Sequence, residues 1–213
     1  FVDCVFMNQS QVALQINIPA SPPGEVLPVD IDGTVFRNAA TGVEINDLGF
    51  GANLDHLATG AIIQNCQTGL RINISGFSSQ CGMTWDRCQI IGAEVGVEVN
   101  RPTSASVFAM TFLHCDIFAT KDAFAIQGSS IGATNLNIHH SNLRGGPGSG
   151  NHAFRSYPST GRLDLAATEN QFDGAVSIQI GNVGAKLLAH NNRFENGPFT
   201  VESTGPSPDF ARN

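Results

Sequence analysis

One eight-residue phrase recurs along the chain, and this recurrence restricts the fold more than any other feature of the sequence. The clearest copy is Met83-Thr84-Trp85-Asp86-Arg87-Cys88-Gln89-Ile90. Similar copies begin at residues 110, 136, 165 and 187, and looser copies begin at 34 and 61. Aligned on Cys88, they give the column Ala39, Cys66, Cys88, Cys115, Ser141, Asn170 and Asn192, with successive steps of 27, 22, 27, 26, 29 and 22 residues by subtraction. Repeats of this length are typical of stacked architectures.

Each copy contains two short runs of alternating apolar residues with polar residues between them. A third run follows a glycine or a loop, as in Gly69-Leu70-Arg71-Ile72 and Gly96-Val97-Glu98-Val99. A period of two indicates strands and not helices, whose apolar residues recur with a period of 3.6. We therefore predict an all-β fold, a single-stranded parallel β-helix with about eight coils of three short strands each.

The residue before Cys88 marks the bend between the first two strands of a coil. Its column reads Asn8, Asn38, Asn65, Arg87, His114, His140, Glu169 and Asn191. Asn tolerates positive φ angles better than most residues do, and His is also enriched there. We expect this column to adopt positive φ at a sharp corner.

The repeat and its corners resemble those of the right-handed β-helices of the pectate-lyase-like superfamily, which includes phage tailspike depolymerases, polysaccharide lyases and hydrolases. The resemblance covers about residues 1–202 and rests on no catalytic signature. It implies a right-handed winding, a polysaccharide or oligosaccharide partner, a homotrimer and an extracellular or virion-associated protein.

Composition narrows the function further. The net charge of −7 argues against a nucleic-acid partner. No apolar run is long enough for a transmembrane helix, so we expect no membrane insertion. The sequence has no nucleotide-binding signature; the glycines between 145 and 150 do not open a helix. We predict no cofactor.

The chain has five cysteines, so at least one has no disulfide partner within it. We expect Cys66, Cys88 and Cys115 to form one inward, reduced column, because buried free cysteine behaves as a small hydrophobic residue. Cysteines stacked at coil spacing do not make a tetrahedral site, so we predict no metal.

The ends and the loops complete the expected organisation. The chain begins within a strand and without a polar cap, which predicts further coils upstream. Residues 203–213 read as a C-terminal tail or linker. The longest insertions are expected at 19–33, 46–60 and 144–152, and such loops often carry binding sites.

Stacking selects the candidate site residues, because it brings distant residues together along the corner. Asp86, His139 and His190 are expected in one corner column with Gln64 and Thr168, and Arg87, His114, His140 and Glu169 in the next. Glycosidases need two carboxyl groups roughly 5 to 9.5 Å apart, which is about one or two strand spacings. Asp86 with Asp116, or Glu169 with Asp173, fits that spacing, whereas a lyase needs a base near a charge-neutralising group.

We assign catalytic roles to Asp86, Asp116, Glu169 and His139, and substrate binding to Arg87, His114, His140 and His190. We expect any glycan contact to fall on this corner. The competing interpretation is that charged corner residues protect exposed edges and maintain solubility.

Two packing predictions test the register. Trp85, Phe112, Ile138, Ala167 and Ala189 should form one inward stack, and Ile90, Ile117, Leu143, Phe172 and Phe194 another. Glu44, Arg71 and Glu98 occupy equivalent third-strand positions, so Arg71 should lie between two carboxylates in a structural ladder.

Three functions stay open at this stage. The first is a β-helix that recognises polysaccharide and degrades it as a lyase or a hydrolase. The second is a structural or adhesive shaft without catalytic activity, and the third is a carbohydrate epimerase on the same scaffold.

Overall fold

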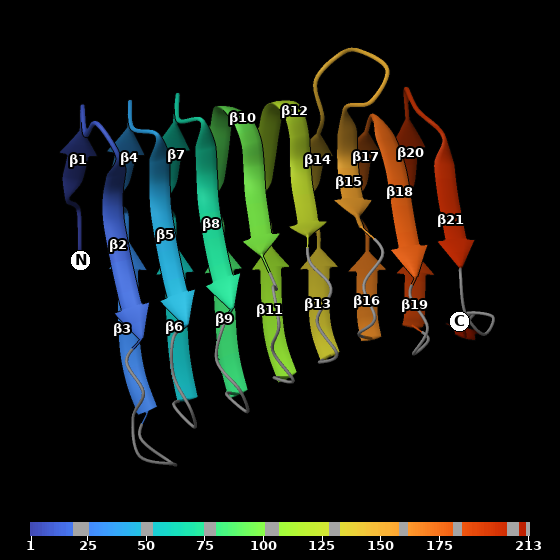
Figure 1. Cartoon of the computed structure of the whole chain (residues 1–213), viewed down its shortest axis with the longest axis horizontal. Coiled ribbons are helices and arrows are strands. Elements are labelled where there is room, and N and C mark those ends of the chain that lie inside the picture. The colour runs from blue at the N-terminus through green and yellow to red at the C-terminus, as the bar shows by residue number, and fades with distance from the viewer. Residues whose placement is uncertain are drawn as a thin grey trace.

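The structure of the protein is a computed structural model that describes residues 1–18, 26–47, 53–74, 80–100, 107–127, 133–157, 162–180, 185–203 and 209–211. Within these residues every regular element is a β-strand, and every strand pairing is parallel. The chain winds as a β-helix whose N- and C-terminal strands lie at opposite ends of the stack (Figure 1). The predicted all-β parallel β-helix is confirmed, while its handedness and coil number stay predictions.

Three faces run along the stack. The first face contains β3 (Val26–Asp32), β6 (Asn53–Thr59), β9 (Gln80–Asp86), β11 (Val107–Leu113), β13 (Ala133–His139), β16 (Arg162–Thr168), β19 (Ala185–His190) and β22 (Asp209–Ala211). The second face contains the three-residue strands β1 (Val5–Met7), β4 (Val35–Arg37), β7 (Ile62–Gln64), β14 (Asn142–Arg144), β17 (Gln171–Asp173) and β20 (Arg193–Glu195). The third face contains β2 (Val12–Ile18), β5 (Thr41–Asp47), β8 (Thr68–Ile74), β15 (His152–Ser156), β18 (Ala175–Ile180) and β21 (Phe199–Ser203).

Two strands depart from the predicted pattern of three short strands per coil. β10 (Gln89–Asn100) and β12 (Asp116–Gln127) each run without a break from the second face onto the third. Their pairing shifts register between Ile91 and Ala93 and again before Val95. These bulges turn the chain without ending the strand.

The predicted inward stacks are confirmed by the register of the strands. Trp85, Phe112, Ile138 and Ala167 are buried partners on the first face, and Ile90, Ile117, Leu143 and Phe172 on the second. Ala189 and Phe194 keep this register but are exposed. β20 ends the second face, and β22 pairs with β19 only as far as Leu188.

The corner prediction is half right. All eight residues of the predicted column have positive φ, between 50° and 58°. They belong to two different corners, however, because Ile62 pairs with Gln89 and not with a residue of β9. Arg87, His114, His140, Glu169 and Asn191 lie at the corner between the first and second faces, whereas Asn8, Asn38 and Asn65 lie where the second face ends.

This error also corrects the cysteine column. The pairing places Ala61, and not Cys66, beside Cys88, so only Cys88 and Cys115 share a column. Gln64 pairs with Ile91 for the same reason and does not share a column with Asp86. Both corners consist of a short strand, a positive-φ residue and a small inward residue, so one alignment could not separate them.

Two of the three predicted insertions each contain a strand of the first face. Residues 26–32 form β3 and residues 53–59 form β6, while 19–25 and 48–52 lie outside the described residues. Pro28 argued against a strand at this position in the sequence. Proline is tolerated here because β3 is the edge strand of its face. Residues 145–151 do form a loop. Within the predicted tail, β22 adds a strand to the first face.

Candidate functional site

The corner between the first and second faces carries five of the eight predicted site residues in one chain of contacts. Arg87 Nε and Nη2 both lie 3.0 Å from Oδ2 of Asp86. Nδ1 of His114, one coil on, donates to Oδ1 of Asp86 at 3.2 Å. The His114 and His140 rings stack with centroids 5.2 Å apart, and His140 Nε2 contacts Glu169 Oε2 at 2.5 Å. We call these five residues the corner chain.

The corner between the first and second faces requires positive φ, and different coils provide it with different residues. Gly33 and Gly60 adopt positive φ there at little cost, but Arg87, His114, His140 and Glu169 adopt it with long side chains. A left-handed residue that is not glycine costs roughly 1–2 kcal/mol. Strain of this kind often occurs at functional sites, so the presence of these side chains at positive-φ positions is consistent with a functional role.

Solvent exposure limits what the corner chain can do. The side chains of Arg87, His114, His140 and Glu169 are each about half exposed or more, and only Asp86 is partly shielded. Each exposed ion pair contributes about 0–1 kcal/mol. Both carboxylates of the corner chain, Asp86 and Glu169, already have a partner, so its geometry is that of a polar ridge and not of a water-excluding catalytic centre.

The other three predicted residues do not join this chain. Asp116 lies on the second face, where its Oδ1 accepts a hydrogen bond from Asn142 Nδ2 at 2.7 Å. His139 shares a row with Asp86, but Leu113 lies between them. His190 is exposed at the end of β19. In the proposed Asp86–Asp116 and Glu169–Asp173 pairs, each of the four carboxylates binds another side chain, and the predicted carboxyl spacing stays a prediction.

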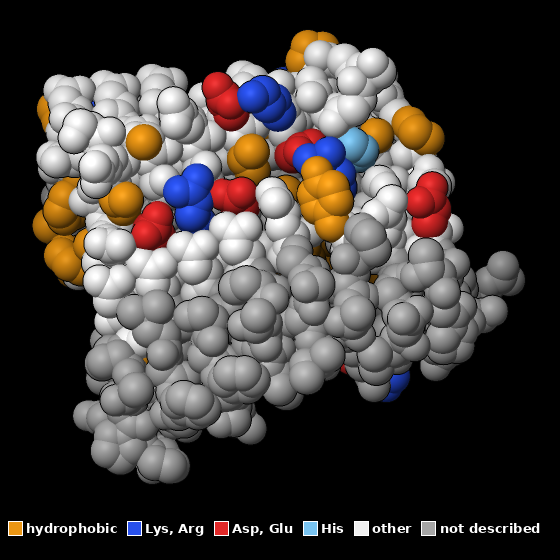
Figure 2. All heavy atoms as spheres, viewed as in Figure 1, with side chains coloured by type: hydrophobic (Ala, Val, Ile, Leu, Met, Phe, Trp, Pro, Cys, Tyr) orange, Lys and Arg blue, Asp and Glu red, His pale blue; other side chains and the backbone are white. Residues whose placement is uncertain are grey.

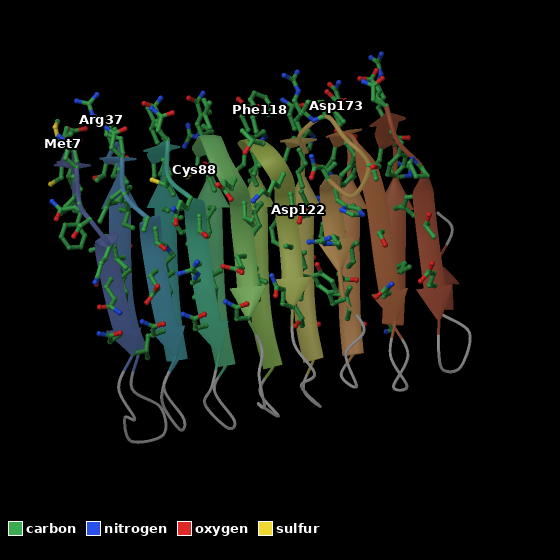
Figure 3. The ribbon with its side chains drawn as sticks, turned by 45° about the horizontal axis from the view of Figure 1, so that its top comes forward. Met7, Arg37, Cys88, Phe118, Asp122 and Asp173 are labelled. Carbon is green, nitrogen blue, oxygen red and sulfur yellow. The ribbon has the colours of Figure 1, made fainter. Side chains whose placement is uncertain are left out.

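The second face forms a narrow polar ledge beside the corner chain. Each of its strands turns its first and third residues outward, and the pairing aligns these residues in two rows. The first row contains Asp116, Asn142 and Gln171, and the second contains Phe118, Arg144 and Asp173. Arg144 Nε donates to Asp173 at 3.0 Å, and its guanidinium lies 5.0 Å from the Phe118 ring centroid. Phe118 and Asp173 lie along the same edge in Figure 3.

Two hollows open on this ledge. A hollow of about 140 Å³ is lined by Phe118, Asn142, Leu143, Arg144, Gln171 and Asp173. A cleft of about 740 Å³ lies under the 145–151 loop, which arches above β14 and β15 in Figure 1, and reaches Asn196 and Pro198. Both are lined by Arg144 and Asp173, so they adjoin each other, and we call the two together the groove. The loop lies close against the body: a Cβ on Gly146 would overlap the Thr120 carbonyl oxygen.

A buried carboxylate anchors the far side of the cleft. Asp122 of β12 is only 6 % exposed through its side chain. Its Oδ1 accepts hydrogen bonds from the His152 backbone N at 2.9 Å and from His152 Nδ1 at 3.1 Å. Its Oδ2 accepts one from Arg155 Nη2 at 2.5 Å, and the Arg155 guanidinium lies over the Tyr157 ring at 4.5 Å. Asp122 therefore fixes the residue at which the loop re-enters the third face (Figure 3).

The third face carries two structural ladders. Arg71 lies between Glu44 at 3.6 Å and Glu98 at 2.8 Å, which confirms the predicted arrangement. Figure 2 shows this row of alternating acidic and basic side chains on the third face. Asn17, Asn46, Asn73 and Asn100 form a second ladder of amide hydrogen bonds, from 2.7 to 2.9 Å long. Sequence reasoning missed this ladder, although asparagine recurs there at intervals of 29, 27 and 27 residues by subtraction.

Sequence reasoning also missed Phe118, Arg144, Asp122 and His152 as site residues. The signal for the cleft was present, because the glycine-rich 144–152 segment was recognised as a loop able to carry a site. No pattern marked Asp122, because an acidic residue between Lys121 and Ala123 reads as an exposed turn position.

The described cysteines and acids give no metal centre. Cys4, Cys66, Cys88 and Cys115 are free thiols, and the last three are buried. Among the described residues, no group of three or more His, Cys, Asp or Glu side chains has the geometry of a metal site. No helix in this part of the chain is long and apolar enough to cross a membrane.

Comparison with protein-family models, with curated proteins and with solved structures finds no match for this chain.

Proposed function

We propose that this protein is a polysaccharide-recognising β-helix of the pectate-lyase-like kind, which binds an oligosaccharide stretch of its ligand along the ledge. The observation that carries the proposal is the pair of adjoining hollows, the 140 Å³ hollow and the 740 Å³ cleft, which share Arg144 and Asp173. The groove extends from β12 across β14 and β17 to Asn196, the residue that follows β20, and these four adjacent strands extend over about 14 Å at strand spacing. Its larger part falls within the usual range of ligand sites, about 300–1,000 Å³.

The chemistry of the groove suits sugar hydroxyl groups. Asn142 and Gln171 offer amide donors and acceptors, and Phe118 offers an apolar ring next to them. Arg144 and Asp173 neutralise each other at 3.0 Å, so the groove has no unpaired cation for a polyanion. Together with the net charge of −7, this favours neutral glycans over acidic ones.

The predicted corner residues border the same ledge. His140 and Asn142 are separated by one residue, and the ledge is only three residues wide, or about 7 Å between its outer Cα atoms. A ligand on the ledge therefore passes between the corner chain and the loop. We keep the lyase or hydrolase activity, and the catalytic roles of Asp86, Asp116, Glu169 and His139, as part of this proposal, with a homotrimer and an extracellular or virion-associated setting.

Three arginine variants test the proposal. Arg144→Ala removes a groove residue, and Arg37→Ala is its matched control because Arg37 occupies the same row of the second face, outside the groove. Affinity electrophoresis in gels containing neutral and acidic polysaccharides measures binding. We expect retardation by at least one neutral polysaccharide, a loss of about tenfold in affinity for Arg144→Ala because a charge-assisted bond contributes roughly 1.5–3 kcal/mol, and no change for Arg37→Ala.

Arg87→Ala locates the binding edge. Its Asp86 contact matches that of Arg144 with Asp173 in length, and both arginines are more than half exposed. Loss of binding in Arg87→Ala but not in Arg144→Ala would move the site to the corner chain. No retardation by any polysaccharide would contradict the proposal.

The exposed pairing of the corner chain favours a second candidate, a structural or adhesive shaft. Every charged residue of the corner chain is paired with a neighbour, as expected of a solvated edge that stays soluble. This reading gains if Arg144→Ala, Asp116→Ala and Glu169→Ala all leave polysaccharide binding and product formation unchanged.

A further inference from the structure

Asp122 fixes the protonation of His152. Asp122 is paired with Arg155 and is therefore a carboxylate, which can only accept hydrogen bonds. His152 Nδ1 lies 3.1 Å from Asp122 Oδ1, so Nδ1 carries the proton. The neutral ring then has its lone pair on Nε2, and among the described residues Nε2 has no hydrogen-bond partner.

His152 also lines the 740 Å³ cleft. An imidazole that lines a ligand-sized cavity and whose Nδ1–H is held by a buried carboxylate has the arrangement that general bases require. Arg155 binds the other carboxylate oxygen of Asp122, Oδ2, and does not line the cleft.

The other groups that line the cleft restrict the reaction. Asp173 is the one carboxylate among the residues that line the cleft. Hydrolysis of a glycosidic bond within the cleft would need a second carboxyl group, which the lining does not provide. Arg144 is the one strong cation among the lining residues, and it is already paired with Asp173. The elimination of an acidic sugar therefore lacks a free charge to neutralise the sugar carboxylate.

Hydrolysis of an ester needs a general base and donors for a developing oxyanion. Gly148, Ser149 and Gly150 line the cleft, and their backbone N–H groups have no acceptor among the described residues. Gly148 and Gly150 have positive φ, which glycine adopts readily, and they carry no side chain that would keep a ligand from the backbone.

We infer that Asp122 and His152 form a base dyad that removes O-acyl groups from a saccharide bound in the cleft. This inference rests on the proposed function for the saccharide nature of the ligand. Water attacks the acyl carbon while His152 Nε2 takes one of its protons. The bond from the acyl carbon to the sugar oxygen then breaks, and the sugar oxygen receives that proton from His152. The products are the free hydroxyl group and a carboxylic acid, and no oxidant or cofactor takes part. His152 is the catalytic residue, and Asp122 is a positioning residue.

Acetate release tests the reaction. The substrates are an acetylated xylan and glucose pentaacetate, because hydrolysis of the small ester does not depend on binding along the ledge. We expect release by the wild-type protein, and a loss of about 10²-fold or more in kcat for His152→Gln, since general base catalysis contributes 10²–10⁴-fold. Asp122→Asn should lower kcat as well, whereas its control Glu94→Gln should not. Glu94 pairs with Lys121, the neighbour of Asp122, and lies on the surface.

A spectroscopic measurement on the unmodified protein covers the case in which the variants do not fold. Long-range ¹H–¹⁵N correlation spectra at pH 7.5 report the tautomer of each histidine, and we expect His152 to carry its proton on Nδ1. A proton on Nε2 would overturn the inference. Absence of acetate release from both substrates would also overturn it, and affinity electrophoresis shows whether polysaccharide binding survives independently. Acetate release without polysaccharide retardation would instead contradict the proposed binding along the ledge and keep the dyad.

Discussion

Two adjacent residues of β12 make ion pairs of nearly equal length in opposite environments, and their loss should have unequal effects on stability. Lys121 Nζ lies 2.6 Å from Glu94 Oε2, with both side chains more than half exposed. Asp122 Oδ2 lies 2.5 Å from Arg155 Nη2, and the Asp122 side chain is 6 % exposed. Glu94→Ala should therefore change the free energy of unfolding by about 0–1 kcal/mol.

Asp122→Ala should cost much more. The substitution removes the acceptor of three hydrogen bonds and leaves the Arg155 guanidinium without its counter-charge. Removing one partner of a buried pair costs roughly 3–5 kcal/mol. Arg155 keeps about a quarter of its side chain in solvent, so we expect the lower end, about 3 kcal/mol. For a chain of this size that corresponds to a fall in Tm of about 6–12 °C.

Urea denaturation followed by tryptophan fluorescence measures both variants. Trp85 is the single tryptophan of the chain and is fully buried, so its emission reports on the core. Limited proteolysis adds a local readout, because Asp122→Ala should expose the 145–151 loop to cleavage before the protein unfolds globally. Equal losses in Glu94→Ala and Asp122→Ala would refute the reasoning that burial, and not contact distance, sets the energy of these pairs.

Three further predictions concern the core and the ladders. Phe124 is fully buried between Phe112 and Phe154, so Phe124→Ala should lower the free energy of unfolding by about 3–5 kcal/mol. Phe194 is 40 % exposed, so Phe194→Ala should lower it by about 1 kcal/mol. Urea midpoints measure both, and similar losses would show that the stack is packed as tightly at its end as in its middle. Burial raises the pKa of the Cys66 thiol, and the hydrogen bond with Cys88, followed by burial, raises the pKa of the Cys115 thiol. At pH 8 iodoacetamide should therefore label neither cysteine in the native protein and both after unfolding, as measured by peptide mass spectrometry. Rapid labelling of the native protein would contradict this burial. Asn73→Ala removes two hydrogen bonds from the middle of the asparagine ladder and should lower the free energy of unfolding by about 1–2 kcal/mol in the same urea assay, while an unchanged midpoint would mean that water replaces the ladder without loss.

The sequence was sufficient for the fold class and for most of the register. Alternation decides which side chains point inward, and the apolar positions at Trp85 and Phe112 left one register that buries both. The sequence was not sufficient to separate the two corners. Asn65 and Arg87 both have positive φ and both precede an inward cysteine, so local chemistry is the same while position in the coil differs. Only the pairing of Ile62 with Gln89 distinguishes them.

Only those parts of the candidate site that repeat from coil to coil were predicted from the sequence. Exposed residues that repeat at coil spacing, such as His114 and His140, come together through stacking alone and can be found by alignment. The Asp122 contacts join β12 to His152 and Arg155 of β15, the strand that follows a loop insertion in the next coil, so they depend on how the loop folds back. A repeat pattern holds no information about an insertion that occurs once.

The cleft lies where the connection between the second and third faces changes from a continuous strand to a loop. β10 and β12 cross from the second face to the third without a break, but in the next coil the chain leaves after β14 and returns at β15. The uninterrupted β12 supplies Asp122 and Thr120 as fixed points, to which His152 is bonded and against which Gly146 packs. The loop is thus held at both ends by the preceding coil, and a cavity can open beneath it while strand pairing stays intact on both sides. The strained corner, the three-residue ledge and the anchored 145–151 loop lie in adjacent coils, and this concurrence is the structural reason to look for function there.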